Sequence, residues 1–378
     1  MPKQNLIERI PDCVLAFRGY NVTNLGRTPE LLEHRAYGAL VERQLAAVSD
    51  AASDILKRRV DLIAQVRERR ESTLAAYGEA LALVLAVEAA HLSILREQFG
   101  VEWSGARFAY GFSLGEIAAV VAGGVLNLRS ALEVLLPLAD DCVTLAHEST
   151  LGVLFTRSRE LSRDDVFRLC LAINQEGRGV MGVSAHLAPN AMLIIGQHDT
   201  LDRFMARAKT QFDVRVHLRK NDAKWPPIHT PIVWQRQISN RAAERMHTMP
   251  LSANAPKPRI FSLVNGCYDY TALTARALLS QWIDHPQRLW DAIYETLAAS
   301  VATILHIGPG PNIIPATYKR LSADVVSQTQ ESRSLRALSA AVRRQWLRRL
   351  LPHRAALLRA PYIEHIILED WLLANASP

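Results

Sequence analysis

The stretch Tyr110-Gly111-Phe112-Ser113-Leu114-Gly115-Glu116-Ile117 decides how the rest of the chain is interpreted. It carries the pattern G-x-S-x-G between residues 107–110, which predict a short strand, and residues 116–122, which predict a buried helix. A sharp strand-to-helix turn lifts a serine hydroxyl out of a sheet, and flanking glycines let the backbone pack through that turn. Ser113 would lie at a helix N-terminus, where the Leu114 N–H can face a developing oxyanion. Ser113 is therefore the candidate nucleophile.

The composition is that of an ordinary globular protein. The 378 residues are 49% hydrophobic and 21% charged, and the net charge of +7 lies largely in the last fifty residues. The four cysteines are far apart, with no C-x-x-C pair, which favours reduced thiols and no metal site. The N-terminus has no apolar signal region, and we expect no bilayer-spanning segment. These features predict a cytoplasmic protein.

The order of the predicted elements indicates an α/β fold. Helical patterns and loops rich in Gly and Asn separate four apolar runs that predict strands, and such an order is typical of a mostly parallel sheet with its site at the strand ends. These runs are 13–17, 107–110, 259–264 and 303–307.

The pattern of predicted strands and helices changes between residues 151 and 219, which predicts a separate module. Its strands and helices follow the order β-α-β-β-α-β, the order of a ferredoxin-like unit. We therefore expect an α/β-hydrolase-like parallel-sheet core formed by residues 1–150 and 220–325, with a ferredoxin-like subdomain inserted at 151–219. Residues 326–378 would form a basic helical extension.

The chain returns to the core at Pro226-Pro227-Ile228-His229-Thr230-Pro231. Prolines on both sides of His229 fix the backbone around it. By itself a lone histidine is more often a structural residue than a catalytic one, so this position depends on its context.

In this context the chain resembles the malonyl-CoA:acyl carrier protein transacylases and the acyltransferase domains of polyketide synthases. The stretch 111–116 resembles that family's G-H-S-x-G-E, 17–21 lies where it has F-P-G-Q-G, and 227–229 resembles its P-x-H. The stretch 263–266 resembles its S-N loop, and 306–310 its E-x-G-P-G. These motifs follow one another in the family's order, from Cys13 to about Leu321.

The resemblance implies a Ser-His dyad. Ser113 would attack an acyl thioester, and His229 would take the serine proton and return it to the leaving thiol. A backbone carbonyl near Val264 and Asn265 would orient the imidazole in place of a carboxylate.

The resemblance also implies the remaining chemistry. The oxyanion hole would consist of the backbone N–H groups of Leu114 and Tyr20. The acyl donor would be an acyl-CoA, and the acceptor the phosphopantetheine thiol of an acyl carrier protein. No metal or redox cofactor and no nucleic acid partner would be involved.

Two departures from the family concern the acyl pocket. Phe112 replaces the usual histidine before the serine, and in an ungapped register Leu138 stands where the family has an arginine that pairs with a malonyl carboxylate. Leucine cannot provide that pairing, and Asp140 and Asp141, which follow it, would repel a carboxylate if they faced the pocket. Unless another arginine reaches the pocket, we expect an uncharged acyl group.

Arginines dominate the extension beyond Leu321. Between Arg333 and Arg359 there is no acidic residue, and apolar residues recur at helical spacing, which predicts a basic amphipathic helix. It would either pack on the body or dock an acidic partner such as a carrier protein, with Arg343, Arg344, Arg348 and Arg349 as the contact residues. The apolar run 362–373 predicts a second helix, which could serve self-association.

Three functions remain open from the sequence. The leading hypothesis is an acyltransferase that loads a carrier protein in fatty-acid or polyketide synthesis. An editing thioester hydrolase would use the same acyl-enzyme but admit water, and a silent docking protein would keep only the fold.

Overall fold

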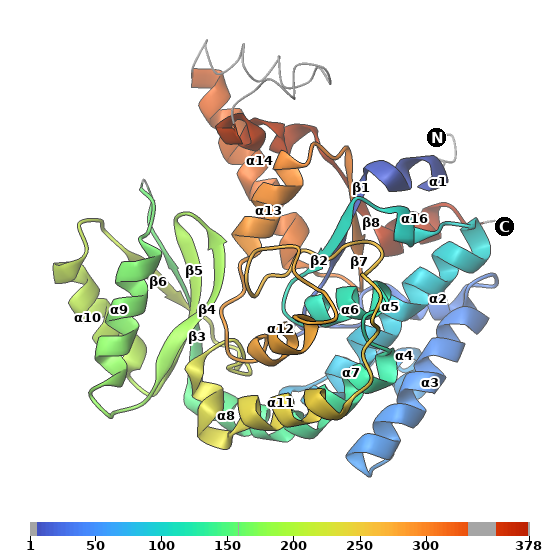
Figure 1. Cartoon of the computed structure of the whole chain (residues 1–378), viewed down its shortest axis with the longest axis horizontal. Helices are drawn as coiled ribbons and strands as arrows, with labels where there is room; N and C mark the ends of the chain where they lie inside the picture. Colours follow the sequence, from blue (N-terminus) through green and yellow to red (C-terminus); the bar gives the residue numbers. More distant parts are fainter. Residues whose placement is uncertain (1–5, 158, 332–352, 377–378) are drawn as a thin grey trace.

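The computed structural model describes residues 6–157, 159–331 and 353–376. It is a mixed α/β structure with a four-stranded parallel sheet, in the order β2-β1-β7-β8, and a separate four-stranded antiparallel sheet, in the order β4-β5-β3-β6. In Figure 1 the antiparallel sheet and its two helices lie to one side of the parallel sheet and its surrounding helices.

The parallel sheet consists of β1 (Cys13–Phe17), β2 (Phe108–Gly111), β7 (Thr303–Ile307) and β8 (Glu364–Ile367). All residues of the first three strands are buried, as expected from continuous apolar runs in a sheet covered on both faces. Phe17 lies opposite both Gly111 and Ile307, so β1, β2 and β7 end at the same edge. The loops that follow these strands are therefore neighbours.

Three of the predicted strands are present, but the fourth is not. The run 259–264 forms only an isolated bridge, in which Ile260 pairs with Ala109. Cis-Pro258 precedes it, and the chain turns away at Ser262 into a loop held by side-chain hydrogen bonds. The apolar run was correct evidence of burial, but not of a full strand.

Helices pack around the parallel sheet. Those before the antiparallel sheet are α1 (Leu6–Arg9), α2 (Thr28–Glu33), α3 (Gly38–Leu56), α4 (Leu62–Arg67), α5 (Tyr77–Phe99), α6 (Leu114–Ala122), α7 (Leu128–Leu135) and α8 (Ala139–Glu148). Those after it are α11 (Ile238–Thr248), α12 (Ala275–Gln281), α13 (Leu289–Ala298), α14 (Ile313–Glu331) and α16 (Leu368–Ala374).

Helix α5 corrects one expectation from the sequence. The helical segment Leu74–Phe99 is long and apolar enough to cross a membrane, although we expected no such segment. Of its most apolar window, 83% is buried inside the protein, as in the central helix of a globular core.

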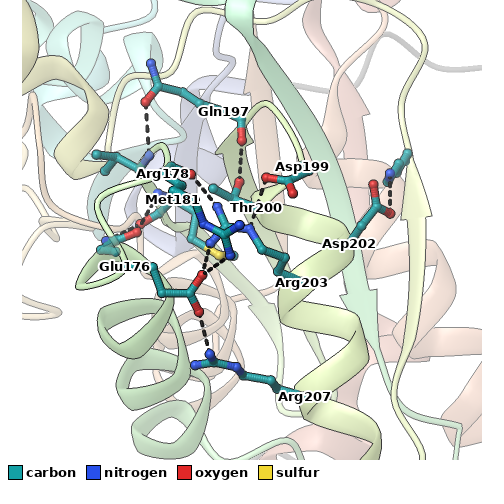
Figure 2. A network of polar contacts seen from close by, with 12 residues as sticks. Glu176, Arg178, Met181, Gln197, Asp199, Thr200, Asp202, Arg203 and Arg207 are labelled. Atoms are coloured by element: carbon teal, nitrogen blue, oxygen red, sulfur yellow. Dashed lines mark hydrogen bonds and ion pairs between the residues drawn. The ribbon is translucent and has the colours of Figure 1, made fainter.

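The antiparallel sheet and its helices follow the order β-α-β-β-α-β. They are β3 (Ser149–Phe155), α9 (Arg163–Asn174), β4 (Met181–Ala188), β5 (Ala191–Gln197), α10 (Thr200–Gln211) and β6 (His217–Lys220). Figure 2 shows the polar cluster that joins the two helices: Glu176, just after α9, pairs with Arg203 and Arg207 of α10 and with Arg178. We call residues 149–220 the antiparallel unit.

The end of the chain differs from the prediction. Most of the expected arginine helix, including Arg343, Arg344, Arg348 and Arg349, lies outside the described residues. Arg359 is buried and donates to the Leu297 carbonyl oxygen at 2.6 Å, so it does not belong to a solvated face. The expected second helix over 362–373 is instead β8, the edge strand of the parallel sheet, followed by α16, whose Leu368 and Leu372 join the larger apolar core.

Candidate active site

Three loops meet at the carboxyl edge of the parallel sheet. They follow β1 at 18–20, β2 at 112–113 and β7 at 308–310. The Phe112 N–H donates to the Phe17 carbonyl oxygen at 3.1 Å, and the Arg18 N–H donates to that of Ile307 at 3.2 Å, so backbone hydrogen bonds continue beyond the strands. In sheets of this kind, ligands bind where such loops converge.

Ser113 occupies the sharp turn that the sequence predicts. Its φ of 54° and ψ of −120° lie outside the regions that most residues adopt, and α6 begins at the next residue. Close packing requires glycine around it: a Cβ on Gly115 would lie 2.3 Å from the Phe17 carbonyl oxygen, and one on Gly19 would lie 2.5 Å from that of Phe112. The first loop therefore passes directly against the serine.

His229 meets Ser113 from a loop more than a hundred residues later. Its Nε2 lies 2.8 Å from the serine Oγ, and its Nδ1 lies 2.6 Å from the Trp282 carbonyl oxygen. Because a carbonyl can only accept, Nδ1 carries the proton and Nε2 is free to accept the serine hydroxyl. Burial lowers the pKa of His229 to about 4, despite the opposing effect of the Trp282 carbonyl. The imidazole is thus a neutral acceptor at pH 7.

The residue that orients His229 differs from the prediction. The group is a backbone carbonyl, as the resemblance implies, but Trp282 supplies it rather than Val264 or Asn265. The Trp282 indole N–H also donates to the Ser113 carbonyl oxygen at 3.0 Å, so this tryptophan contacts both members of the pair. The carbonyl oxygen of Asn265 instead accepts from Arg288 at 2.9 Å.

Glu116 connects the start of α6 to the loop that contains Val264. Its carboxyl group is fully buried and accepts hydrogen bonds from the Ser262 hydroxyl, the Tyr270 hydroxyl and the Leu263 N–H. Burial raises the pKa of Glu116 to about 7, and these three donors oppose the shift. The glutamate of the elbow therefore has a structural role in fixing the helix that follows Ser113.

One predicted oxyanion donor lies on the loop after β1 and the other at the start of α6. Leu114 is the first residue of α6, where the helix leaves its N–H without an intrahelical acceptor, and Tyr20 directly follows the glycine that touches Phe112. Within the described part of the chain, neither N–H donates a hydrogen bond to another residue.

Buried charges hold the first and last loops together. Arg18, which is 1% exposed, donates to the Pro309 carbonyl oxygen at 2.5 Å and to Asn24 Oδ1 at 2.9 Å. Burial lowers the pKa of Arg18 to about 10, which Glu88 partly offsets. In α16, Glu369 accepts the N–H of Gly310 through Oε1 at 2.8 Å. The loop with the Tyr20 N–H is thus fixed by groups from distant parts of the chain.

The two predicted pocket residues lie in different apolar clusters. Phe112 packs on the cluster that contains Tyr110, whereas Leu138 is 2% exposed and belongs to the larger cluster on α5 and α7. Asp141, which follows Leu138 closely, pairs with Arg241 and, at 3.5 Å, with Arg236. These arginines are engaged by that aspartate.

The sequence analysis missed Trp282 and Gln287. Trp282 orients His229 through a backbone carbonyl, a group that every residue has, so no sequence signal could identify that role. Gln287 is fully buried, and its Oε1 accepts the N–H of Ser113 at 3.2 Å. Only its polar side chain between Pro286 and the apolar start of α13 offered a weak signal.

No protein-family model matches the sequence, and no curated protein matches it. Solved structures do match. FabD of Acinetobacter baumannii is 16% identical with a TM-score of 0.65, over 97% of this chain and 98% of that one. The malonyl-CoA:acyl carrier protein transacylase of Xanthomonas oryzae pv. oryzae is 20% identical with a TM-score of 0.64, over 82% and 91%.

A third match is a malonyl-transacylase solved in complex with a type II polyketide synthase acyl carrier protein. It is 21% identical with a TM-score of 0.61, over 81% of this chain and 91% of that one. The chain therefore has the fold of the malonyl-CoA:acyl carrier protein transacylases of known structure.

Proposed function

We propose that the protein is an acyltransferase that moves an acyl group from acyl-CoA, through an ester on Ser113, to the phosphopantetheine thiol of an acyl carrier protein. The hydrogen-bond distance of 2.8 Å between Ser113 Oγ and His229 Nε2 is the observation that carries this proposal. The neutral His229 imidazole, oriented by a carbonyl, can accept the proton of Ser113. The strained turn presents the serine hydroxyl, and the N–H groups of Leu114 and Tyr20 could stabilise an oxyanion, so the arrangement is suited to acyl transfer.

The reaction would have two matched halves. Ser113 Oγ attacks the thioester carbon while its proton passes to His229 Nε2, and the N–H groups of Leu114 and Tyr20 stabilise the oxyanion. The C–S bond then breaks, and the CoA sulfur takes the proton from His229. In the second half the carrier thiol gives its proton to His229 and attacks the ester, and Ser113 leaves with that proton. The scheme uses no metal and no redox cofactor.

We infer that the acyl group is uncharged. With Leu138 in place of an arginine, a malonyl carboxylate would lack the guanidinium partner that the family resemblance implies. Burying an unpaired carboxylate costs several kcal/mol, whereas each methylene removed from water contributes about 0.8 kcal/mol. The balance favours acetyl or longer saturated chains.

The acceptor proposal is supported by the fold match to a transacylase that was solved with its carrier protein. Arg343, Arg344, Arg348 and Arg349 would form a basic docking surface for an acidic carrier in the cytoplasm. Reversing these four charges should raise the KM for the carrier and flatten its salt dependence, while the rate of acylation from CoA stays the same. Unchanged carrier kinetics would contradict this docking role.

Intact-mass spectrometry with a panel of acyl-CoAs tests the function. We expect an adduct on the unaltered protein that holo carrier protein discharges, no adduct on Ser113→Ala, and a normal adduct on the control Ser93→Ala. His229→Ala should slow acylation by roughly a hundredfold. Turnover without an acceptor would instead identify a hydrolase, and no adduct with any donor would identify a docking protein. Adduct formation at the same rate by Ser113→Ala would contradict the mechanism.

A further inference from the structure

Gln287 is a buried side chain at the nucleophile with no role in the scheme above. It is 0% exposed and lies two residues before α13. Its Oε1 accepts the N–H of Ser113 at 3.2 Å, while its Nε2 is buried and has no hydrogen-bond partner among the described residues. The oxygen of the amide is therefore hydrogen-bonded, to Ser113, whereas the nitrogen is not.

The unpaired Nε2 lowers the stability that this glutamine can contribute, so its amide is favourable only through Oε1. A buried donor without an acceptor is destabilising, whereas methionine would fill a similar space without such a group. The favourable contribution of Gln287 must come from its contact with Ser113. That hydrogen bond restrains the peptide plane that leads into the strained φ of 54° at the serine, and so the direction of Oγ.

The backbone of Gln287 is fixed to β4 of the antiparallel unit. Its N–H donates to the Ser184 carbonyl oxygen at 2.9 Å, and its carbonyl oxygen accepts from the His186 N–H at 2.8 Å. These two bonds form the parallel bridge between Ala185 and Gln287. Any shift of β4 along its axis would therefore move the amide that holds Ser113.

The same strand also supports the histidine. The Ser184 hydroxyl donates at 3.3 Å to the carbonyl oxygen of Ile228, the residue before His229. Gly182 lies two residues before Ser184 in β4. A Cβ on Gly182 would lie 2.6 Å from Pro231 Cδ, so β4 is in close contact with the loop that follows His229. One strand thus contacts both Gln287, whose side chain binds Ser113, and the loop that contains His229.

We propose that Gln287 is a positioning residue for the nucleophile, and that β4, through Gln287 and Ser184, sets the distance between Ser113 and His229. This inference rests on the proposed role of Ser113. The antiparallel unit thereby has a part in acyl transfer besides any contact with substrate. Because a misplacement of about 1 Å can lower a rate about a hundredfold, loss of this support should be visible in the kinetics.

The test compares Gln287→Met with Gln287→Glu. Methionine removes the acceptor, and glutamate keeps an oxygen for the Ser113 N–H. The matched control is Gln197→Met, because Gln197 is also buried in the antiparallel unit and its Oε1 accepts the Val180 N–H at 3.0 Å, in the cluster of Figure 2. Each variant is treated with a fluorophosphonate and, separately, with acyl-CoA, and labelling of Ser113 is followed by intact mass.

The fluorophosphonate separates this inference from the proposed function. Ser113 Oγ bonds to phosphorus, fluoride leaves, and the serine proton passes to His229, so labelling requires a positioned nucleophile but no acyl-CoA site. We expect Gln287→Met to slow labelling by about tenfold or more, with a Tm no lower than that of Gln197→Met, and Gln287→Glu to restore most of the rate.

Any of three results would overturn the inference. Gln287→Met could be labelled at the rate of the unaltered protein, or its labelling rate could fall no further than that of Gln197→Met. A folded Gln287→Glu could also fail to recover the labelling rate. If the unaltered protein reacts with the fluorophosphonate but with no acyl-CoA, the proposed function fails while the positioning role is still measured. An unaltered protein that does not react with the fluorophosphonate contradicts both.

Discussion

Lowering the pH to 6 tests whether buried His229 is the base. Burial disfavours the charged imidazole, so the pKa of His229 falls to about 4, and the Trp282 carbonyl opposes this shift only in part. Acylation needs the neutral form, which can accept the proton of Ser113. The rate should therefore persist at a pH where an ordinary histidine has lost most of its basicity.

The size of the effect follows from the two pKa values. At pH 6 a group with a pKa of about 4 is about 99% neutral, whereas one at the ordinary value of about 6.5 is only about a quarter neutral. We expect the first-order acylation rate at pH 6 to stay within a few per cent of its value at pH 8. If His229 had the ordinary pKa of an exposed histidine, the acylation rate at pH 6 would be roughly fourfold lower than at pH 8.

The assay is single-turnover acylation across pH 5 to 8, quenched in acid and read by intact mass, with the acyl-CoA that reacts fastest. Near-UV circular dichroism at each pH serves as control, because the same burial makes protonation favour the unfolded chain. For a histidine whose folded pKa is lowered, stability falls as pH drops below about 6.5. A half-point for acylation near pH 6.5 in the folded protein would refute the reasoning.

Three further predictions concern the elbow and the pocket. Gly115→Ala should prevent normal folding, because its Cβ would lie 2.3 Å from a backbone oxygen, whereas Gly105→Ala, with 3.7 Å to its nearest neighbour, should melt normally in the same thermal scan. Glu116→Ala should lower the free energy of unfolding in urea by about 1–3 kcal/mol, since it leaves the Tyr270 hydroxyl and Leu263 N–H unpaired, and an unchanged midpoint would contradict this. Leu138→Arg should shift adduct masses toward malonyl when malonyl-CoA and octanoyl-CoA compete, and a malonyl preference already present in the unaltered protein would argue against our register at that position.

The sequence predicted those parts of the fold that local pattern controls. The runs at 13–17 and 303–307 became β1 and β7 with the same bounds, because a short, wholly apolar segment between turn signals fits a buried parallel strand. β8 was missed although Ile363, Ile366 and Ile367 favour a strand, because the whole apolar run 362–373 was interpreted as one helix. Pro137 lies in the short 3₁₀ segment that separates α7 from α8.

The candidate site was predictable only where side chains carry the chemistry. Ser113 has a local signature, but its meeting with His229 across 116 positions could be inferred only from a family resemblance. The Trp282 carbonyl and the Gln287 amide could not be inferred, because each acquires its role from a tertiary contact rather than from its neighbours in sequence. The same reason explains why Val264 and Asn265 were the wrong choice for the carbonyl.

The contact between Glu369 and the loop after β7 has a consequence for biosynthesis. Ribosomes make the elbow, the histidine loop and β7 before α16, and Glu369 accepts the N–H groups of both Arg27 and Gly310. During translation those two donors have no carboxylate to bind until α16 has been made. The loop after β7 therefore reaches its final support only after α16 has been made, and a nascent chain that stops before β8 would expose an unpaired edge of β7 to other chains.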